Sequence, residues 1–286
     1  MQPLKECTIT VVGLGLMGGS LAGALRGHCR EVIGVDRDAE AVEAAVRAQF
    51  ADRGARDLAE GIMQADIVVL ATPVRTIVRL LGEVGPWLRE GALLMDLGST
   101  KTQILDAMAL LPDHVQPLGG HPMCGKETSG IAAADVALFR DRTFILSPLP
   151  RTSPDALDLG ASLARAVGAT PLVVGAERQD FLVGTLSHLP YLLACSLVST
   201  ADATTSADPL VWQIMAGGFR DTSRVAGSDV TMMLDILMTN REEILTAARL
   251  CAGRLDHLIR LVEEGDETQL RSELSHIQRT RKEMYP

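Results

Sequence analysis

The stretch LGGHPMCGKETSG, residues 118–130, places a single histidine, His121, between a glycine pair and a proline. It follows a short strand-like run, 115–118, and Pro122 fixes the backbone beside it. A neutral imidazole just past a strand end can accept a proton or a hydrogen bond from a substrate hydroxyl. His121 is therefore a candidate general base, and the alternative is a structural histidine whose ring is hydrogen-bonded within the core.

Two further stretches carry residues suited to binding. In SHLPY, residues 187–191, His188 lies in a segment without charged residues, two positions before a proline. An ionisable group in such a place is either well hydrogen-bonded or functional. In GGFRDTSR, Arg220 and Arg224 follow two glycines, and one guanidinium can present a bidentate fork to a carboxylate. The alternative is that these arginines are only solvated.

The segment TITVVGLGLMGGSLAGAL combines a strand, a glycine-rich turn and a helix, as in a dinucleotide-binding turn. Gly13 permits the tight turn, Gly15 lets a pyrophosphate approach the backbone, and Gly18 lets the helix pack on the sheet. The helix N-terminus, with Leu16 and Met17 in its first turn, offers unpaired N–H groups to phosphates. These five residues are the predicted phosphate site, and the alternative is a glycine turn in a domain that binds no nucleotide.

The next predicted strand ends in EVIGVDRD, which places Asp36 and Arg37 near the expected adenosine. A carboxylate there accepts hydrogen bonds from the ribose and repels a 2′-phosphate, so Asp36 favours NAD as the cofactor over NADP. Arg37 could instead hold that phosphate, which leaves NADP as the alternative.

Two later motifs, ATPVRT and DLGSTK, follow predicted strands of the same half of the chain. In open α/β sheets ligands lie beyond the carboxyl ends of the strands. We therefore expect Thr72 and Pro73 to contact the cofactor, and Ser99 and Lys101 to line the crevice that cofactor and substrate share. The alternative is that both motifs are ordinary connecting loops.

The elements that must position these residues divide the chain into two expected domains, 1–175 and 176–286. The first alternates β-branched runs with helical patterns, which is typical of a doubly wound, mostly parallel Rossmann-type sheet. The second shows only helical patterns, and a stripe of apolar residues along it indicates burial against other helices or a partner subunit. The predicted strands are 8–12, 31–35, 66–71, 92–97, 115–118, 143–147 and 170–174. The predicted helices of the second domain are one over 177–203, a short one opened by Asp208 and Pro209 and closed by Gly217 and Gly218, a long one from Ser228 to Glu264, and a polar one after Gly265.

Composition narrows the function classes. A net charge of −9 and a pI near 5.2 argue against a nucleic-acid partner. The five cysteines are scattered, without a CxxC pair, which suits a reducing compartment and no structural metal. The first residues lack a signal-peptide pattern, so we expect a cytoplasmic protein. The uncharged run 181–201 is long enough to span a bilayer, but its moderate hydrophobicity favours a helix buried in a domain or dimer core over a membrane partner.

Five motifs in this order, VVGLGLMGGSLAGAL, DLGSTK, GGHPMCGKETSG, SHLPY and GGFRDTSR, resemble the prephenate/arogenate dehydrogenase family of tyrosine biosynthesis. The resemblance covers nearly the whole chain. It implies an NAD-dependent oxidative decarboxylation of prephenate to 4-hydroxyphenylpyruvate, by a homodimer with a nucleotide-binding domain followed by a helical dimerisation domain. By motif it implies that His121 is the base toward the ring C4 hydroxyl, with Ser99 assisting. It likewise implies that His188 lines the substrate pocket and Arg224 binds a substrate carboxylate, while Glu127 is similar to a family position at the pocket mouth.

Three alternatives remain at this point. An acidic Glu127 could favour the ammonium of arogenate, giving an arogenate or dual-specificity cyclohexadienyl dehydrogenase, or it could be a gate. A β-hydroxyacid dehydrogenase-like enzyme would use a lysine from the helical domain, and the only lysines are Lys5, Lys101, Lys126 and Lys282, none of them in the central helices. A non-catalytic NAD-binding dimer is disfavoured by the joint presence of the site residues. We expect neither a fused chorismate mutase domain nor a C-terminal regulatory domain.

Overall fold

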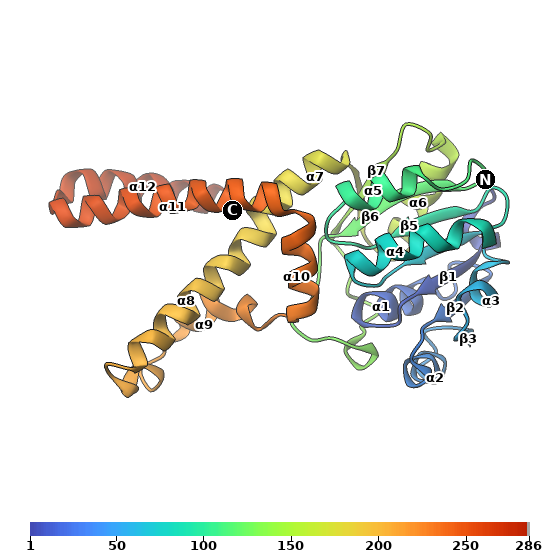
Figure 1. Cartoon of the computed structure of the whole chain (residues 1–286), viewed down its shortest axis with the longest axis horizontal. Helices are drawn as coiled ribbons and strands as arrows, with labels where there is room; N and C mark the ends of the chain where they lie inside the picture. Colours follow the sequence, from blue (N-terminus) through green and yellow to red (C-terminus); the bar gives the residue numbers. More distant parts are fainter. Residues whose placement is uncertain (285–286) are drawn as a thin grey trace.

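The computed structural model describes residues 1–284 as a sheet domain followed by an arm of helices (Figure 1). Eight strands form one sheet in the order β3-β2-β1-β4-β5-β6-β7-β8. The strands from β1 to β6 are parallel, whereas β7 is antiparallel to β6 and parallel to β8. The strands are β1 Thr8–Val12, β2 Glu31–Val35, β3 Arg53–Ala55, β4 Ile67–Leu70, β5 Leu93–Asp96, β6 Gln116–Pro122, β7 Thr143–Pro148 and β8 Thr170–Val173.

Helices cover both faces of this sheet, because the buried strands present apolar side chains on each side. One core lies between the sheet and helices α1 and α6, and a second lies between the opposite face and helices α3, α4 and α5. The predicted doubly wound sheet is confirmed. The helices of this domain are α1 Leu16–Leu25, α2 Ala39–Arg47, α3 Leu58–Ile62, α4 Val74–Val84, α5 Thr102–Ala109 and α6 Pro154–Ala166.

Two strands differ from the sequence prediction. The short strand β3 was not predicted, because two of its three residues are exposed and it shows no apolar alternation. Strand β6 is longer than predicted and includes His121, which was expected just past its end. The extra length comes from antiparallel pairing with β7, in which His121 lies opposite Ile145.

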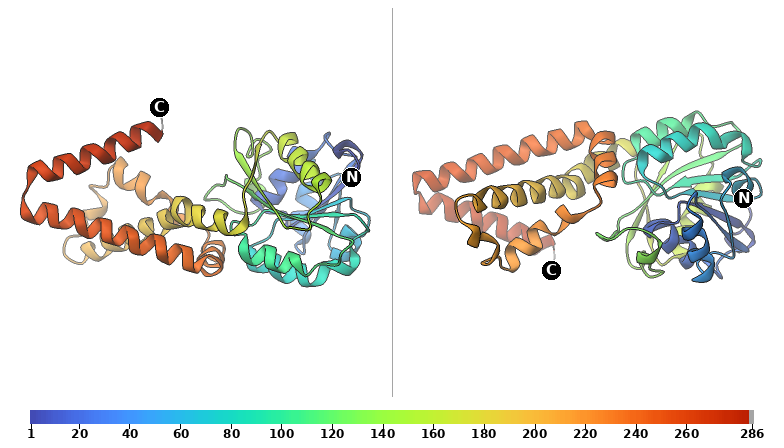
Figure 2. Two further views of the ribbon diagram at one scale, coloured as in Figure 1. Left: turned by 90° about the horizontal axis from the view of Figure 1, so that it is seen from above. Right: turned by 60° about the horizontal axis from the view of Figure 1, so that its bottom comes forward.

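The second half of the chain is helical and projects away from the sheet, with α11 and α12 as its longest antiparallel pair (Figure 2). The predicted long helix from Ser228 is interrupted at Asn240, whose φ of −122° and ψ of 34° separate α10 from α11. Gly217 opens a helix, α9, and does not close one as predicted. The helices are α7 Ala176–Val183, a π-helical turn Gly184–His188, α8 Leu189–Thr205, α9 Gly217–Ser223, α10 Val230–Thr239, α11 Arg241–Glu264 and α12 Glu267–Met284.

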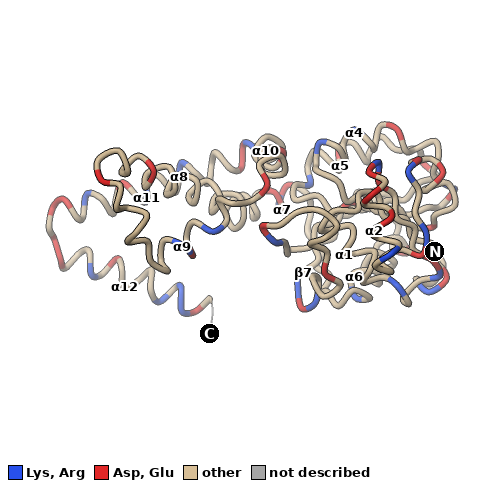
Figure 3. The backbone as a smooth tube through the Cα atoms, turned by 90° about the horizontal axis from the view of Figure 1, so that it is seen from below, with Lys and Arg blue, Asp and Glu red and all other residues tan. Residues whose placement is uncertain are grey.

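The continuous helical segment Ala176–Thr205 is the one helix of the described chain whose length and composition would suffice to cross a membrane. Its mean hydropathy is 1.6, and only 22% of its apolar window is buried within the single chain. Core helices of soluble proteins meet the same criteria of length and composition. Large apolar side chains such as Phe181 and Leu186 are 55% and 72% exposed, so this segment presents an apolar face outward. Elsewhere acidic and basic residues are interspersed over both halves of the chain (Figure 3).

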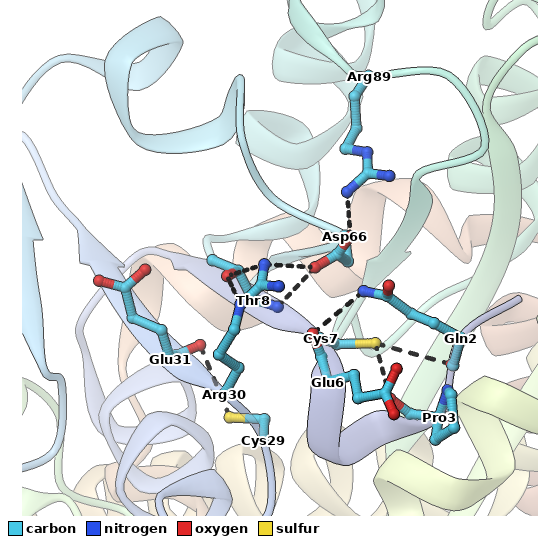
Figure 4. Close-up of polar contacts among 10 residues, drawn as sticks. All are labelled: Gln2, Pro3, Glu6, Cys7, Thr8, Cys29, Arg30, Glu31, Asp66 and Arg89. Atoms are coloured by element: carbon cyan, nitrogen blue, oxygen red, sulfur yellow. Dashed lines mark hydrogen bonds and ion pairs between the residues drawn. The ribbon is translucent and has the colours of Figure 1, made fainter.

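The buried carboxylate of Asp66 links the amino ends of strands β1, β2 and β4 through hydrogen bonds and ion pairs (Figure 4). Asp66 is 6% exposed and accepts a hydrogen bond of 2.7 Å from the backbone N–H of Thr8. Arg30 pairs with the same carboxylate at 3.2 Å, and Arg89 pairs with its other oxygen. This network stabilises the end of the sheet opposite to the carboxyl ends, where the predicted site residues lie.

Candidate active site

His121 is buried in β6 with only 8% of its surface exposed. No hydrogen-bond partner for its Nδ1 atom lies within residues 1–284. Burial lowers the pKa of this imidazole to about 3, and the nearby charge of Lys101 and the ring of His188 act in the same direction. The ring is therefore neutral at physiological pH and has a lone pair free to accept a proton or hydrogen bond.

The glycines before His121 serve packing within the sheet. A Cβ atom on Gly120 would lie 2.5 Å from the backbone oxygen of Asp96, and one on Gly119 would lie 2.6 Å from a methyl group of Leu105. The two glycines therefore allow β6 to approach the end of β5 and α5 closely. This approach sets the position of His121.

A fully buried ion pair lies behind His121. Lys101 and Asp96 are both 0% exposed, and the lysine Nζ contacts the carboxylate directly. Asp96 also accepts hydrogen bonds from the N–H groups of Gly98, at 2.7 Å, and Gly120, at 3.1 Å. Lys101 was expected to line the crevice, and the structure places its side chain in the interior with its charge paired to Asp96. It acts on His121 through its electric field.

Ser99 lies two residues before Lys101 and contacts the helical domain through its backbone. The residue is half-buried in the loop after β5. Its backbone oxygen accepts a hydrogen bond of 3.4 Å from the amide Nε2 of Gln179 in α7. Gln179 is itself 0% exposed, and its Oε1 has no partner among the described residues.

His188 occupies the last position of the π-helical turn that precedes Pro190. A proline inside a helix removes one backbone hydrogen bond and clashes with the preceding turn, and π turns of this kind are frequent at functional sites. His188 is 1% exposed, its Nδ1 lies 3.2 Å from Nδ2 of Asn240, and its Nε2 has no partner in the described chain. Burial lowers the pKa of its imidazole to about 4.

The helical domain is fixed against the sheet domain by carboxylates at helix N-termini. Asp180 of α7 accepts hydrogen bonds from the N–H groups of Lys101, at 2.7 Å, and Thr102, at 2.8 Å, where α5 begins. Asp235 of α10 accepts one of 3.1 Å from the N–H of Arg75 in the first turn of α4. Such caps complement the helix dipole. These contacts hold α7, which continues into the π-helical turn that ends at His188, against the start of α5.

Sequence reasoning missed Asp96, Asp180 and Asn240. Asp96 is the first residue of the DLGSTK motif, but its carboxylate was not singled out there, and Asp180 lies in none of the motifs. Asn240 did carry a signal, because it is the only asparagine among 286 residues. Its partners come from α7 and the π-helical turn, which are far away in sequence, so its role could not be inferred before the fold was known.

Arg224 and Glu127 form an ion pair that joins α9's C-terminal end to the loop after β6. Their side chains are 62% and 38% exposed, so the pair lies at the surface. The structure thus brings together residues from the GGFRDTSR and GGHPMCGKETSG motifs. Arg224 holds a carboxylate, as expected of its chemistry, but the carboxylate is one of the chain's own.

The glycine turn fits a bound pyrophosphate. Gly13 has a φ of +95°, and a Cβ there would meet the backbone oxygen of Ala71 at 2.9 Å. A Cβ on Gly18 would lie 1.8 Å from the oxygen of Gly13, whereas nothing lies within 4 Å of the Cβ position of Gly15. Gly15 caps α1, which begins with Leu16 and Met17, and no side chain hydrogen-bonds to this cap. The open N-terminus of α1 is suited to phosphate oxygens.

The remaining cofactor candidates surround this turn. Asp36 follows β2, and its carboxylate accepts hydrogen bonds from the N–H groups of Leu14, at 2.7 Å, and Asp38, at 3.0 Å. A carboxylate offers about four lone-pair positions, so acceptor capacity remains for a ribose. Thr72 has a buried Oγ1 without a partner in the described residues, and it lies next to Gly13. Pro73 and Arg37 are exposed.

Models of two domain families together match almost the entire chain. The prephenate dehydrogenase nucleotide-binding domain matches residues 21–173, and the prephenate dehydrogenase dimerization domain matches residues 175–276. The chain belongs to the prephenate dehydrogenase family. It is therefore a dehydrogenase, and the predicted order of a nucleotide-binding domain before a helical dimerisation domain is confirmed. The outward apolar face of the segment Ala176–Thr205 lies in this dimerisation domain.

Individual relatives agree with the family assignment. The prephenate dehydrogenase of Bacillus subtilis is 34% identical over 274 residues, which cover 94% of this chain and 74% of that protein. The crystal structure of prephenate dehydrogenase from Aquifex aeolicus in complex with hydroxyphenyl propionate and NAD+ has a TM-score of 0.91 at 30% identity, covering 99% of this chain and 100% of that one. Synechocystis arogenate dehydrogenase has a TM-score of 0.83 at 31% identity, covering 97% and 99%.

Proposed function

We propose that this member of the prephenate dehydrogenase family catalyses the NAD-dependent oxidative decarboxylation of prephenate to 4-hydroxyphenylpyruvate. The observation that carries the proposal is the pair of buried, neutral imidazoles of His121 and His188, each with one ring nitrogen that has no partner in the described chain. Unpaired buried polar atoms are costly, so a ligand that pairs with both of them would bind well.

The glycine turn would hold the cofactor. Gly13, Gly15, Leu16, Met17 and Gly18 would receive the pyrophosphate at the N-terminus of α1. Asp36 would accept hydrogen bonds from the adenosine ribose, beside the exposed Arg37, while Thr72 and Pro73 would border the nicotinamide half. When bound, NAD supplies a hydride acceptor. The NAD+ in the Aquifex aeolicus complex supports this choice over NADP.

His121 would act as the general base. Its unprotonated nitrogen accepts the proton of the C4 hydroxyl while the hydride leaves the same carbon, and Ser99 assists that hydroxyl. The new C4 carbonyl is conjugated with the ring and withdraws electrons from the carbon that bears the carboxylate. That carboxylate leaves as carbon dioxide and its bonding electrons enter the ring, which becomes aromatic as the C4 oxygen takes back the proton held by His121. The protein therefore needs chiefly to position C4 and to bind an anion.

Arg224 and His188 would bind the substrate, with Glu127 at the pocket mouth. The guanidinium of Arg224 suits a substrate carboxylate, and Glu127 is the group that a carboxylate would replace. The same Glu127 could interact with the ammonium of arogenate, which makes an arogenate or dual-specificity enzyme the second candidate. A cyclohexadienyl dehydrogenase from Zymomonas mobilis, 30% identical over 256 residues, and the Synechocystis arogenate dehydrogenase support keeping this alternative.

The proposed enzyme is a cytoplasmic homodimer. The match of the helical half to a dimerisation domain supports the dimer, because a second copy would cover the apolar face that includes Phe181 and Leu186. The five free cysteines support a reducing compartment.

The test is a set of initial-rate assays of purified protein with prephenate and arogenate, each with NAD and NADP. We expect the highest kcat/KM with prephenate and NAD, together with release of carbon dioxide and 4-hydroxyphenylpyruvate. A higher kcat/KM with arogenate would establish the second candidate, and no turnover of either substrate would reject both.

A further inference from the structure

Asn240 lies at the junction of α10 and α11 and is 4% exposed. Its Nδ2 atom lies 2.8 Å from the backbone oxygen of Asp180 and 3.2 Å from Nδ1 of His188. One amide nitrogen therefore contacts two groups from the helix that carries His188. An NH2 group has two hydrogens, which is the number that this arrangement requires.

The contact with Asp180 fixes the orientation of the Asn240 amide. A backbone carbonyl oxygen can only accept a hydrogen bond, so the atom of Asn240 that faces it must be the nitrogen and not the oxygen. The same nitrogen faces His188, and its second hydrogen points to a ring nitrogen that must then accept. Nδ1 of His188 is consequently unprotonated.

A neutral imidazole with an unprotonated Nδ1 carries its hydrogen on Nε2. Burial lowers the pKa of His188 to about 4, which keeps the ring neutral at physiological pH. The Nε2 atom is buried and has no acceptor among residues 1–284. His188 therefore offers a donor, while the neutral ring of His121 offers an acceptor.

The local packing is shaped for this contact. Gly184 begins the π-helical turn, and a Cβ atom there would lie 3.3 Å from Cβ of Glu243 and 3.6 Å from Nδ2 of Asn240. A side chain at this position would crowd Glu243, so a glycine favours the close approach of the first turn of α11 to the π-helical turn. The break between α10 and α11 then places Asn240 against both Asp180 and His188.

We propose that Asn240 is a positioning residue that holds His188 as the Nε2–H tautomer, so that His188 donates a hydrogen bond to an oxygen atom of the bound substrate. The hydrogen bond from His188 to the substrate rests on the proposed function, whereas the tautomer follows from the contacts of Asn240 alone. A hydrogen bond to one ring nitrogen of a histidine determines which nitrogen, protonated or not, the ring presents to its ligand.

The tautomer can be measured directly in the full-length dimer. Protein labelled with ¹⁵N-histidine contains six histidines, and the spectrum of His188→Gln assigns the His188 signals in a long-range ¹H–¹⁵N correlation. We expect a pyridine-type Nδ1 and a pyrrole-type Nε2 at neutral pH, without any ligand. The reverse pattern, or an imidazolium, would overturn the proposal.

Variants of Asn240 test the cause of the tautomer. In Asn240→Asp a carboxylate faces Nδ1 and favours its protonation, so the His188 pattern should shift toward Nδ1–H or imidazolium, whereas Asn240→Ala should give a mixture. Arg241→Gln, at the exposed neighbouring position, is the matched control and should leave the spectrum unchanged. If Asn240→Asp does not fold, the spectra of Asn240→Ala and the wild type still show whether Asn240 determines the tautomer of His188. An unchanged His188 pattern in folded Asn240 variants would overturn the role of Asn240.

Steady-state kinetics test whether His188 donates a hydrogen bond to the substrate. Loss of one donor to a charged oxygen corresponds to about a tenfold or greater rise in the prephenate KM of Asn240→Asp, with kcat less affected. An unchanged KM in a variant whose tautomer has shifted would overturn the donation to substrate. If the wild-type protein turned over neither prephenate nor arogenate but gave the expected spectrum, the proposed function would fail and the tautomer assignment would stand.

Discussion

The guanidinium of Arg224 is ion-paired with the carboxylate of Glu127, which connects the helical domain to the loop that follows β6. Both side chains are more than one third exposed, and pairs of this kind contribute only about 0–1 kcal/mol to stability. The pair can therefore open at little cost. In the proposed function Arg224 binds a substrate carboxylate, so Glu127 and that carboxylate would compete for one guanidinium.

Replacing Arg224 with alanine should chiefly weaken substrate binding. Charge-assisted hydrogen bonds contribute about 1.5–3 kcal/mol, so we expect the KM for prephenate to rise about tenfold or more, with a smaller change in kcat. Arg220→Ala, four residues earlier in α9, is the matched control. An unchanged KM in Arg224→Ala would remove this arginine from the substrate site.

Neutralising Glu127 should release Arg224 for the substrate. In Glu127→Gln we expect the KM for prephenate to fall by up to about fivefold, the scale of an exposed ion pair. Arogenate carries an ammonium, so its KM should not fall in proportion if Glu127 binds that group. Asp135→Asn is the control, because Asp135 forms a 3.0 Å ion pair with Lys126 near the same loop. A rise in the prephenate KM would contradict the competition between carboxylates.

Removing the imidazole of His121 should slow the chemical step. General-base catalysis contributes about 10²–10⁴-fold, so His121→Asn should reduce kcat by about 10² or more. The affinity of this variant for NAD, measured by fluorescence or calorimetry, should equal that of the wild type because the glycine turn is intact. His114→Asn is the control and should leave kcat near the wild-type value. His114 precedes β6 at the other end of the strand, and its Nε2 lies 3.1 Å from the backbone oxygen of Leu88. Near-normal turnover in His121→Asn would exclude it as the base.

The sequence predicted the arrangement of the sheet more completely than the arrangement of the site. Seven of the eight strands and the turn at Gly13 follow from local patterns, since apolar runs and glycine spacing are properties of short segments. The burial of Lys101 and the contact of Asn240 with His188 depend on residues distant along the chain. Local sequence likewise could not show that Arg224 pairs with Glu127, because many carboxylates were available to it.

The choice between NAD and NADP should depend on the charge of Asp36. Initial rates of the wild type should be higher with NAD, and Asp36→Asn should narrow this preference because the repulsion of a 2′-phosphate is lost. Asp36 also accepts the N–H of Leu14, so the variant should bind both cofactors somewhat more weakly. Asp38→Asn, which changes the cap of α2, is the control. A wild-type preference for NADP would show that Arg37 decides cofactor selection.

The two buried histidines should make the fold sensitive to acid. Their folded pKa values of about 3 and about 4 lie below the value of 6.5 expected without burial, so the unfolded chain binds more protons than the folded one between these limits. Their contribution to stability is therefore complete above about pH 6.5 and is lost as the pH falls toward 4. The slope is up to about 1.4 kcal/mol per pH unit for each histidine.

Thermal unfolding from pH 7 to pH 4.5, at fixed protein concentration and ionic strength, measures this effect. The melting temperature of His121→Asn should fall less steeply on acidification than that of the wild type, because one buried group that must be protonated on unfolding is gone. His28→Asn, at an exposed position, should follow the wild-type curve. Parallel curves for His121→Asn and the wild type would mean that the imidazole of His121 is accessible to protons in the folded protein.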